Sequence, residues 1–165
     1  MQFRIQYAFI LFSALALGAC RQADGPMPAM NPNIQGELED VRHDLQNIAT
    51  GYDKQAPQDL AGDLKKYSDK RSAHPAIDEL TRKTADVLPG KKVDEQTGNR
   101  LAHTLWTVVA GRELSDRQVE MLQNDLQSIL VSVGVAEATA QQIGVQAGEV
   151  QKQVTSRDKR WYEWF

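Results

Sequence analysis

The stretch that decides the fold runs from Leu114 to Gly134 and reads LSDRQVEMLQNDLQSILVSVG. Ser115 and Gln118 have the spacing of a capping box, in which each side chain binds the backbone N–H of the other at the start of a helix. Apolar residues then recur at intervals of three and four before a glycine, at Val119, Leu122, Leu126, Ile129, Val133 and Gly134. This pattern predicts an amphipathic helix with one buried face.

Five further stripes of helical spacing cover most of the chain. They begin near Ile34, Pro57, Pro75, Asp94 and Ala136, and the first one extends to Tyr52. Proline in a first turn, Asp94 as an N-cap and glycine after a last turn mark the helix boundaries. No alternating strand pattern of useful length is present. Residues 34–165 are therefore expected to form an all-α antiparallel bundle of about six helices.

Composition narrows the classes of function. The 165 residues include 19 Lys and Arg against 22 Asp and Glu, a balance that argues against a nucleic-acid-binding protein. A single cysteine excludes an internal disulfide and a multi-cysteine metal site. His43, His74 and His103 fall on different predicted helices without metal-ligand spacing, and no nucleophile motif or phosphate loop is present. We expect no enzyme activity, metal or cofactor, and the oligomeric state stays open.

The N-terminus has the features of a secretory signal. Arg4 is the only charged residue before position 21, and it precedes the apolar run from Ala8 to Leu17, which is too short to span ~30 Å of hydrocarbon. The run ends in Leu17, Gly18, Ala19 and Cys20, which resembles the lipobox of bacterial lipoproteins. The alternative is an ordinary signal, cut nearby, that leaves a free thiol.

The resemblance implies a lipid anchor. Cys20 would receive a diacylglyceryl thioether, the signal 1–19 would be removed, and in many bacteria the new amino group is acylated as well. Arg21 follows the cysteine, which in Gram-negative bacteria implies the periplasmic side of the outer membrane rather than the inner membrane. Residues 20–33 are rich in proline and predict a flexible tether that spans at most ~40 Å.

The C-terminal tail gathers four aromatic residues directly after a basic step, Arg157-Asp158-Lys159-Arg160. These aromatic residues are Trp161, Tyr162, Trp164 and Phe165. Such a sequence suits a membrane interface or an anchor in the pocket of a partner protein. Alternatively, the sixth helix continues past Val154, and the rings cover the core.

The sixth predicted helix also carries small residues at intervals of four, namely Ala136, Ala140, Gly144 and Gly148. Such a ridge allows the backbone of another element to approach closely. We expect that element to be another helix of the bundle, with a second protomer or a different protein as the alternatives.

These features favour a lipid-anchored envelope protein that acts as a non-catalytic adaptor for another envelope protein. The main alternative is a small helical chaperone or envelope-stress sensor, because Leu114-Ser115-x-x-Gln118 resembles the Leu-Thr-x-x-Gln signature of such periplasmic proteins. An unrecognised hydrolase is the third possibility.

Overall fold

A computed structural model describes residues 32–156, apart from the side chains of Pro32, Asn33, Ile34 and Glu37. The predicted signal, Cys20 and most of the predicted tether lie outside the described residues, as does the tail 157–165.

The described chain folds into six helices, with no strand between residues 32 and 156. They are α1 (Pro32–Thr50), α2 (Ala56–Lys66), α3 (His74–Val87), α4 (Glu95–Val109), α5 (Asp116–Ser132) and α6 (Glu137–Thr155). A short 3-10 turn, η1 (Arg71–Ala73), precedes α3 and was not expected from the sequence. The structure confirms the predicted all-α antiparallel bundle.

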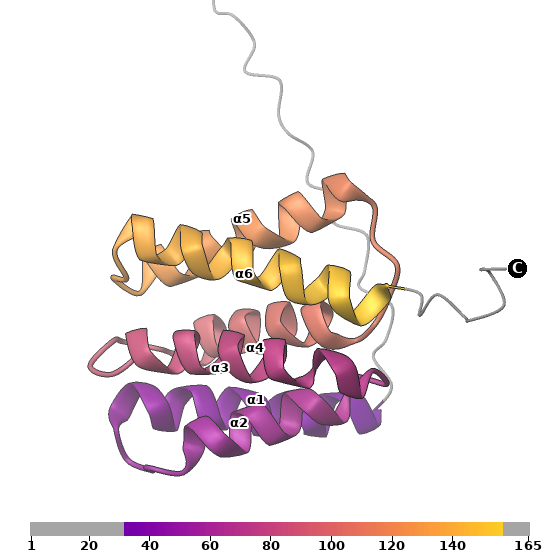
Figure 1. The fold of residues 1–165 in the computed structure, drawn as a ribbon. Helices are drawn as coiled ribbons and strands as arrows, with labels where there is room; N and C mark the ends of the chain where they lie inside the picture. The colour runs from indigo at the N-terminus through magenta and orange to yellow at the C-terminus, as the bar shows by residue number, and fades with distance from the viewer. Residues whose placement is uncertain (1–31, 157–165) are drawn as a thin grey trace, which may run out of the picture. The chain divides into compact units, whose positions relative to one another are not determined.

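The helices form three layers of two, which are α1 with α2, α3 with α4, and α5 with α6 (Figure 1). In the central layer, α4 packs against α1 and α5, while α3 packs against α2 and α6. The hairpin of α5 and α6 has the most extensive contact between any two helices of the described bundle.

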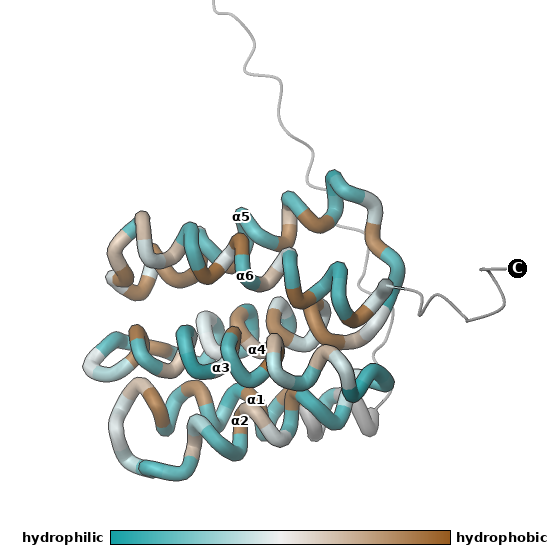
Figure 2. Tube along the Cα trace, in the orientation of Figure 1, coloured by the Kyte–Doolittle hydropathy of each residue, from teal (hydrophilic) through white to brown (hydrophobic). Residues whose placement is uncertain are grey.

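The core is built from the predicted apolar stripes. Hydrophobic and hydrophilic residues alternate along every helix (Figure 2), as an amphipathic helix requires. The largest fully buried side chains come from all six helices and include Leu45, Leu60, Leu80, Leu101, Leu126 and Ile143. The stripes therefore turn toward one another and form one continuous cluster.

The helix boundaries follow the local signals in the sequence. Asp94 accepts a hydrogen bond from the Thr97 backbone N–H at 2.8 Å, and Ser115 and Gln118 form both bonds of the capping box. Pro57 and Pro75 lie in the first turns of α2 and α3. Glycines with positive φ end four of the helical segments, at Gly51, Gly90, Gly111 and Gly134. These boundary predictions are confirmed.

Three boundaries differ from expectation. The first helix begins at Pro32, two residues before Ile34, because proline fits the first turn of a helix. It ends at Thr50, and Tyr52 lies beyond the left-handed Gly51 with 87% of its surface exposed, so its assignment to the buried stripe was wrong. At the other terminus α6 stops at Thr155, and Ser156 has a non-helical ψ of 128°.

Two hydrogen bonds hold helix ends and loops together at one end of the bundle. At this end, which we call the loop end, the Gly90 N–H donates to the Ala49 carbonyl and Lys91 Nζ donates to the Gly134 carbonyl. These bonds bring together the last turn of α1, the α3–α4 loop and the α5–α6 loop. The start of α1 and the end of α6 therefore both lie at the opposite end, which we call the terminal end (Figure 1).

Candidate functional site

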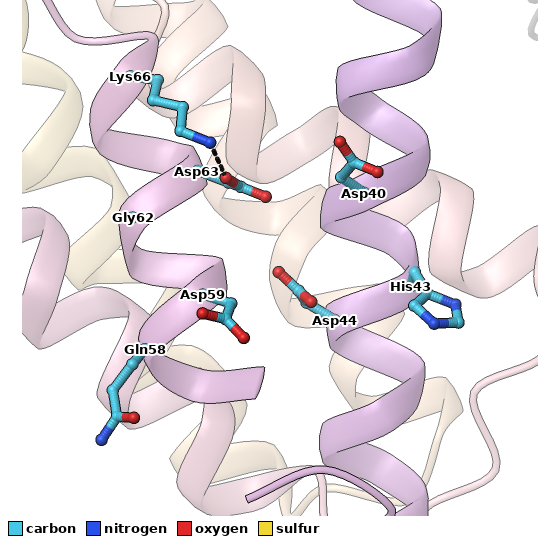
Figure 3. Close-up of a pocket in the computed structure, with 8 residues that line it drawn as sticks. All are labelled: Asp40, His43, Asp44, Gln58, Asp59, Gly62, Asp63 and Lys66. Carbon is cyan, nitrogen blue, oxygen red and sulfur yellow. Dashed lines mark hydrogen bonds and ion pairs between the residues drawn. The ribbon is translucent and has the colours of Figure 1, made fainter. Parts of the chain in front are cut away.

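A groove of about 420 Å³ lies between α1 and α2 (Figure 3). Its described lining residues are Asp40, His43, Asp44, Gln58, Asp59, Gly62, Asp63 and Lys66. Each helix contributes two aspartates at a spacing of four residues, which places the two carboxylates of a pair on one helix face. Four carboxylates therefore gather around one hollow, which we call the acidic groove.

Asp44 has the most unusual environment in the acidic groove. Its carboxylate points into the space between the two helices, and its Oδ2 atom is buried without a hydrogen-bond partner. Burial raises the pKa of Asp44 from 3.8 to about 6, and the negative charges of Asp63, Asp59 and Asp40 add to this rise. The neighbouring His43 acts in the opposite direction. Asp44 therefore changes between its neutral and its charged form near pH 6.

The lining of the acidic groove includes one positively charged side chain, Lys66. Lys66 Nζ contacts Asp63 Oδ1 at 2.5 Å, and the lysine side chain is largely exposed while the aspartate is largely buried. Both residues of this ion pair lie on α2.

Carboxylates are the most frequent side chains in the lining of the acidic groove. No hydroxyl or thiol side chain is among the described residues that line the groove. Within residues 32–156, no group of three or more His, Cys, Asp or Glu side chains has the geometry to hold a metal ion. A lysine or arginine entering the groove would favour the ionised form of Asp44 and lower its pKa. The groove can therefore attract a positively charged group.

A second cluster lies at the terminal end. The ring of Trp106 on α4 meets Tyr67 in an edge-to-face contact with 6.5 Å between centroids, and the guanidinium of Arg112 lies 5.7 Å from the Trp106 centroid. The Arg112 carbonyl accepts a hydrogen bond of 2.7 Å from the buried amide of Gln151 on α6. This cluster joins the ends of α2, α4 and α6.

The small-residue ridge of α6 packs against α5. Ala140, Gly144 and Gly148 are buried, and a Cβ added to Gly144 would lie 2.8 Å from the carbonyl oxygen of Gln123. A Cβ on Gly148 would meet the side-chain amide of the same glutamine. Ala136 is different, because it is the exposed N-cap residue of α6. The neighbour of the ridge is thus a helix of the same bundle.

The three histidines lie on three different helices. His43 is exposed on α1, His74 opens α3 with a buried Nε2 that has no hydrogen-bond partner, and His103 lies 6.1 Å from Trp106 between ring centroids. The remaining predicted site residues lie outside the described part of the chain, namely Leu17, Gly18, Ala19, Cys20, Trp161, Tyr162, Trp164 and Phe165.

Sequence reasoning missed the acidic groove. A signal was present, since Asp40 with Asp44 and Asp59 with Asp63 repeat the same spacing on adjacent predicted helices. Each pair alone is typical of a solvated helix face. Only the packing of α1 on α2 makes the two pairs face one hollow.

Comparison with known proteins identifies no family for this chain. No protein-family model, curated protein or solved structure matches this chain. Among the helices of residues 32–156, none combines the length and the apolar character needed to cross a membrane.

Proposed function

We propose that this protein is a lipid-anchored envelope protein whose helical bundle binds another envelope protein and performs no catalysis. Cys20 carries the lipid, and the bundle lies on the periplasmic side of the outer membrane. The lipobox resemblance supports the anchor, and the structure of the bundle supports the binding role.

The observation that carries the binding role is that the apolar stripes of the helices are buried in the core. A chaperone that holds unfolded clients needs a contiguous exposed apolar surface. Here the stripes are buried against one another. Four large hydrophobic side chains are exposed in the described residues, one in the α1–α2 loop, two on α5 and one on α6, namely Tyr52, Met121, Val131 and Val145. Recognition through a largely polar surface favours a specific partner over many unfolded clients.

The residues that resemble the chaperone signature have a local role. Ser115 and Gln118 bind each other's backbone N–H at the start of α5, with the Gln118 Oε1 accepting from the Ser115 N–H at 2.9 Å. This capping box accounts for both residue types without a shared function. The resemblance to the signature therefore needs no shared function to explain it.

The acidic groove suggests the chemistry of the partner. It combines a hollow of about 420 Å³ with the buried, unpartnered Oδ2 atom of Asp44. A partner that inserts lysine or arginine side chains would neutralise carboxylates that now repel one another. We therefore expect a basic segment on the partner and binding that weakens as salt is added.

Crosslinking in intact cells, followed by affinity purification of the full-length protein, tests this proposal. The expected result is one dominant partner at a fixed stoichiometry. A broad set of unrelated proteins would contradict the adaptor role and favour the chaperone.

A pair of matched variants locates the contact. Asp44→Asn with Asp59→Asn removes two carboxylates from the acidic groove, whereas Glu120→Gln with Asp125→Asn removes two from the exposed face of α5. We expect the groove variant to lose most of the crosslinked partner and the α5 variant to retain it. Equal recovery from both would place the partner elsewhere on the bundle.

A further inference from the structure

The carboxylate of Asp44 lies between α1 and α2 and points into the acidic groove (Figure 3). Its Oδ2 atom is buried and has no hydrogen-bond partner. Lys66, the positively charged side chain of the described lining, contacts Asp63 on its own helix. A buried carboxylate without a donor is costly in its charged form, whereas the neutral acid is much less so. The environment of Asp44 therefore favours the protonated form.

The negative charges that face Asp44 also oppose its ionisation. Asp59 and Asp63 face it from α2 and Asp40 from its own helix, whereas His43 acts in the opposite direction. Burial and the three carboxylates together raise the pKa of Asp44 to about 6. Asp44 is consequently charged in most molecules at pH 7.5 and neutral in most molecules at pH 5.

The helices on either side direct charged groups toward α1 and α2 that are already paired. From α3, Asp78 binds Lys65 Nζ at 2.7 Å. From α4, Glu95 binds Arg42 Nη1 at 3.3 Å. A cationic side chain from a partner is therefore the counterion that Asp44 can gain.

From this geometry we infer that the acidic groove binds its basic partner together with the ionised form of Asp44, and releases that partner when the surroundings become acidic. The inference rests on the proposed function, in which a lysine or arginine of the partner enters the groove. A cation beside Asp44 stabilises the carboxylate, so the carboxylic acid and the cation give an ion pair and one proton in solvent. By reciprocity, added protons oppose binding of the cation.

The size of the effect follows from the population of the ionised form. A partner that requires the carboxylate binds only those molecules in which Asp44 is ionised, and its apparent affinity falls with that fraction. The fraction decreases from nearly all molecules at pH 7.5 to about one tenth at pH 5. The apparent affinity should therefore decrease by about tenfold over this interval.

Isothermal titration calorimetry of the full mature chain with a lysine peptide tests this inference. The probe is a synthetic oligolysine peptide with blocked ends, because lysine keeps its charge throughout this pH range. The ionic strength is low and the same at each pH, since salt screens the attraction. We expect the peptide to bind about tenfold more weakly at pH 5 than at pH 7.5.

The proton released on binding gives a second readout. Titrations in two buffers with different ionisation enthalpies count the protons that leave the protein when the peptide binds. At pH 6 about half of the molecules hold a proton on Asp44, so about half a proton should be released for each bound peptide. At pH 7.5 almost none should be released.

Three single substitutions assign the effect to Asp44, and circular dichroism shows that each variant is folded at both pH values. Asp44→Asn should bind at every pH about as weakly as wild type does at pH 5, without proton release at pH 6. Asp125→Asn, which removes a carboxylate from the exposed face of α5, should keep the pH dependence and the proton release. Histidine also gains charge below neutral pH, so His43→Gln is the second control and should keep the pH dependence.

Failure of the pH control is distinguishable from failure of the proposed basic partner. Equal affinity at pH 5 and pH 7.5, without proton release at pH 6, would overturn the inference and leave the basic partner in place. Absence of binding at pH 7.5 would overturn the basic partner and the inference with it. If Asp44→Asn kept the pH dependence of wild type, or His43→Gln lost it, the control would belong to another group and the inference would be wrong.

Discussion

Replacement of Asp44 by asparagine is expected to stabilise the bundle at neutral pH. The Oδ2 atom of Asp44 is buried without a hydrogen-bond partner, and Asp40, Asp59 and Asp63 line the same groove. Asparagine has nearly the same size and carries no charge. The substitution therefore removes an unfavourable buried charge without opening a cavity.

The magnitude follows from the pKa. Folding raises the pKa of Asp44 from 3.8 to about 6, so the folded protein holds this proton more tightly than the unfolded chain does. The free energy of unfolding consequently falls as pH rises from about 4 to about 6. The interval between the two pKa values corresponds to about 3 kcal/mol. Since Asp44 is partly exposed, solvent screening reduces the expected cost of its charge to about 1–2 kcal/mol.

Urea denaturation, monitored by far-UV circular dichroism, measures the effect. At pH 7 Asp44→Asn should raise the free energy of unfolding by about 1–2 kcal/mol, and near pH 4 the gain should vanish because Asp44 is then protonated in the folded protein. Glu79 and Asp94 have lowered pKa values and contribute the opposite slope at lower pH, so the comparison is always with wild type at the same pH. Asp125→Asn, on the exposed face of α5, is the control and should change little.

A loss of stability at pH 7 would refute this reasoning. It would mean that the charge of Asp44 is compensated in the folded protein. A gain that persists unchanged at pH 4 would also refute it, because the effect would then arise from something other than ionisation.

Other substitutions test the packing and the caps. In thermal denaturation Gly144→Ala should lower the free energy of unfolding by about 1–2 kcal/mol, because its Cβ would lie 2.8 Å from the Gln123 carbonyl oxygen. Gly62→Ala is the control: its Cβ would meet nothing within 4 Å, and it should raise the free energy of unfolding by up to about 1 kcal/mol. Ser115→Ala should cost about 1 kcal/mol through loss of the α5 capping box, and Ser115→Thr should restore most of it in urea melts. Gln151→Met should cost about 1–3 kcal/mol in urea melts, because the buried amide donates to the α4–α5 loop at 2.7 Å; a smaller effect would mean that water replaces the bond.

Local signals predicted most of the fold. Asp94 and Ser115 cap helices through bonds within four residues, and Pro57 and Pro75 act through their own backbone geometry. Such signals are fully contained in short stretches of sequence. The buried stripes followed for the same reason, since their period depends only on the helix.

What could not be predicted depends on contacts between distant residues. The acidic groove exists because α1 packs on α2, and the spacing of Asp40 and Asp44 alone does not reveal that packing. Tyr52 continued the spacing of its stripe, but Gly51 turned the chain before it and left it exposed. The partner of the ridge at Gly144 also became known only from the antiparallel contact of α5 and α6.

The central claim is that this bundle works at a membrane to which Cys20 anchors it. Mass spectrometry of the mature N-terminal peptide, isolated from the membrane fraction of the producing cell, tests that claim most directly. The account predicts a chain that begins at Cys20 and carries a diacylglyceryl thioether on its sulfur. A chain that begins at another residue, with the Cys20 thiol free or the cysteine removed, would contradict it.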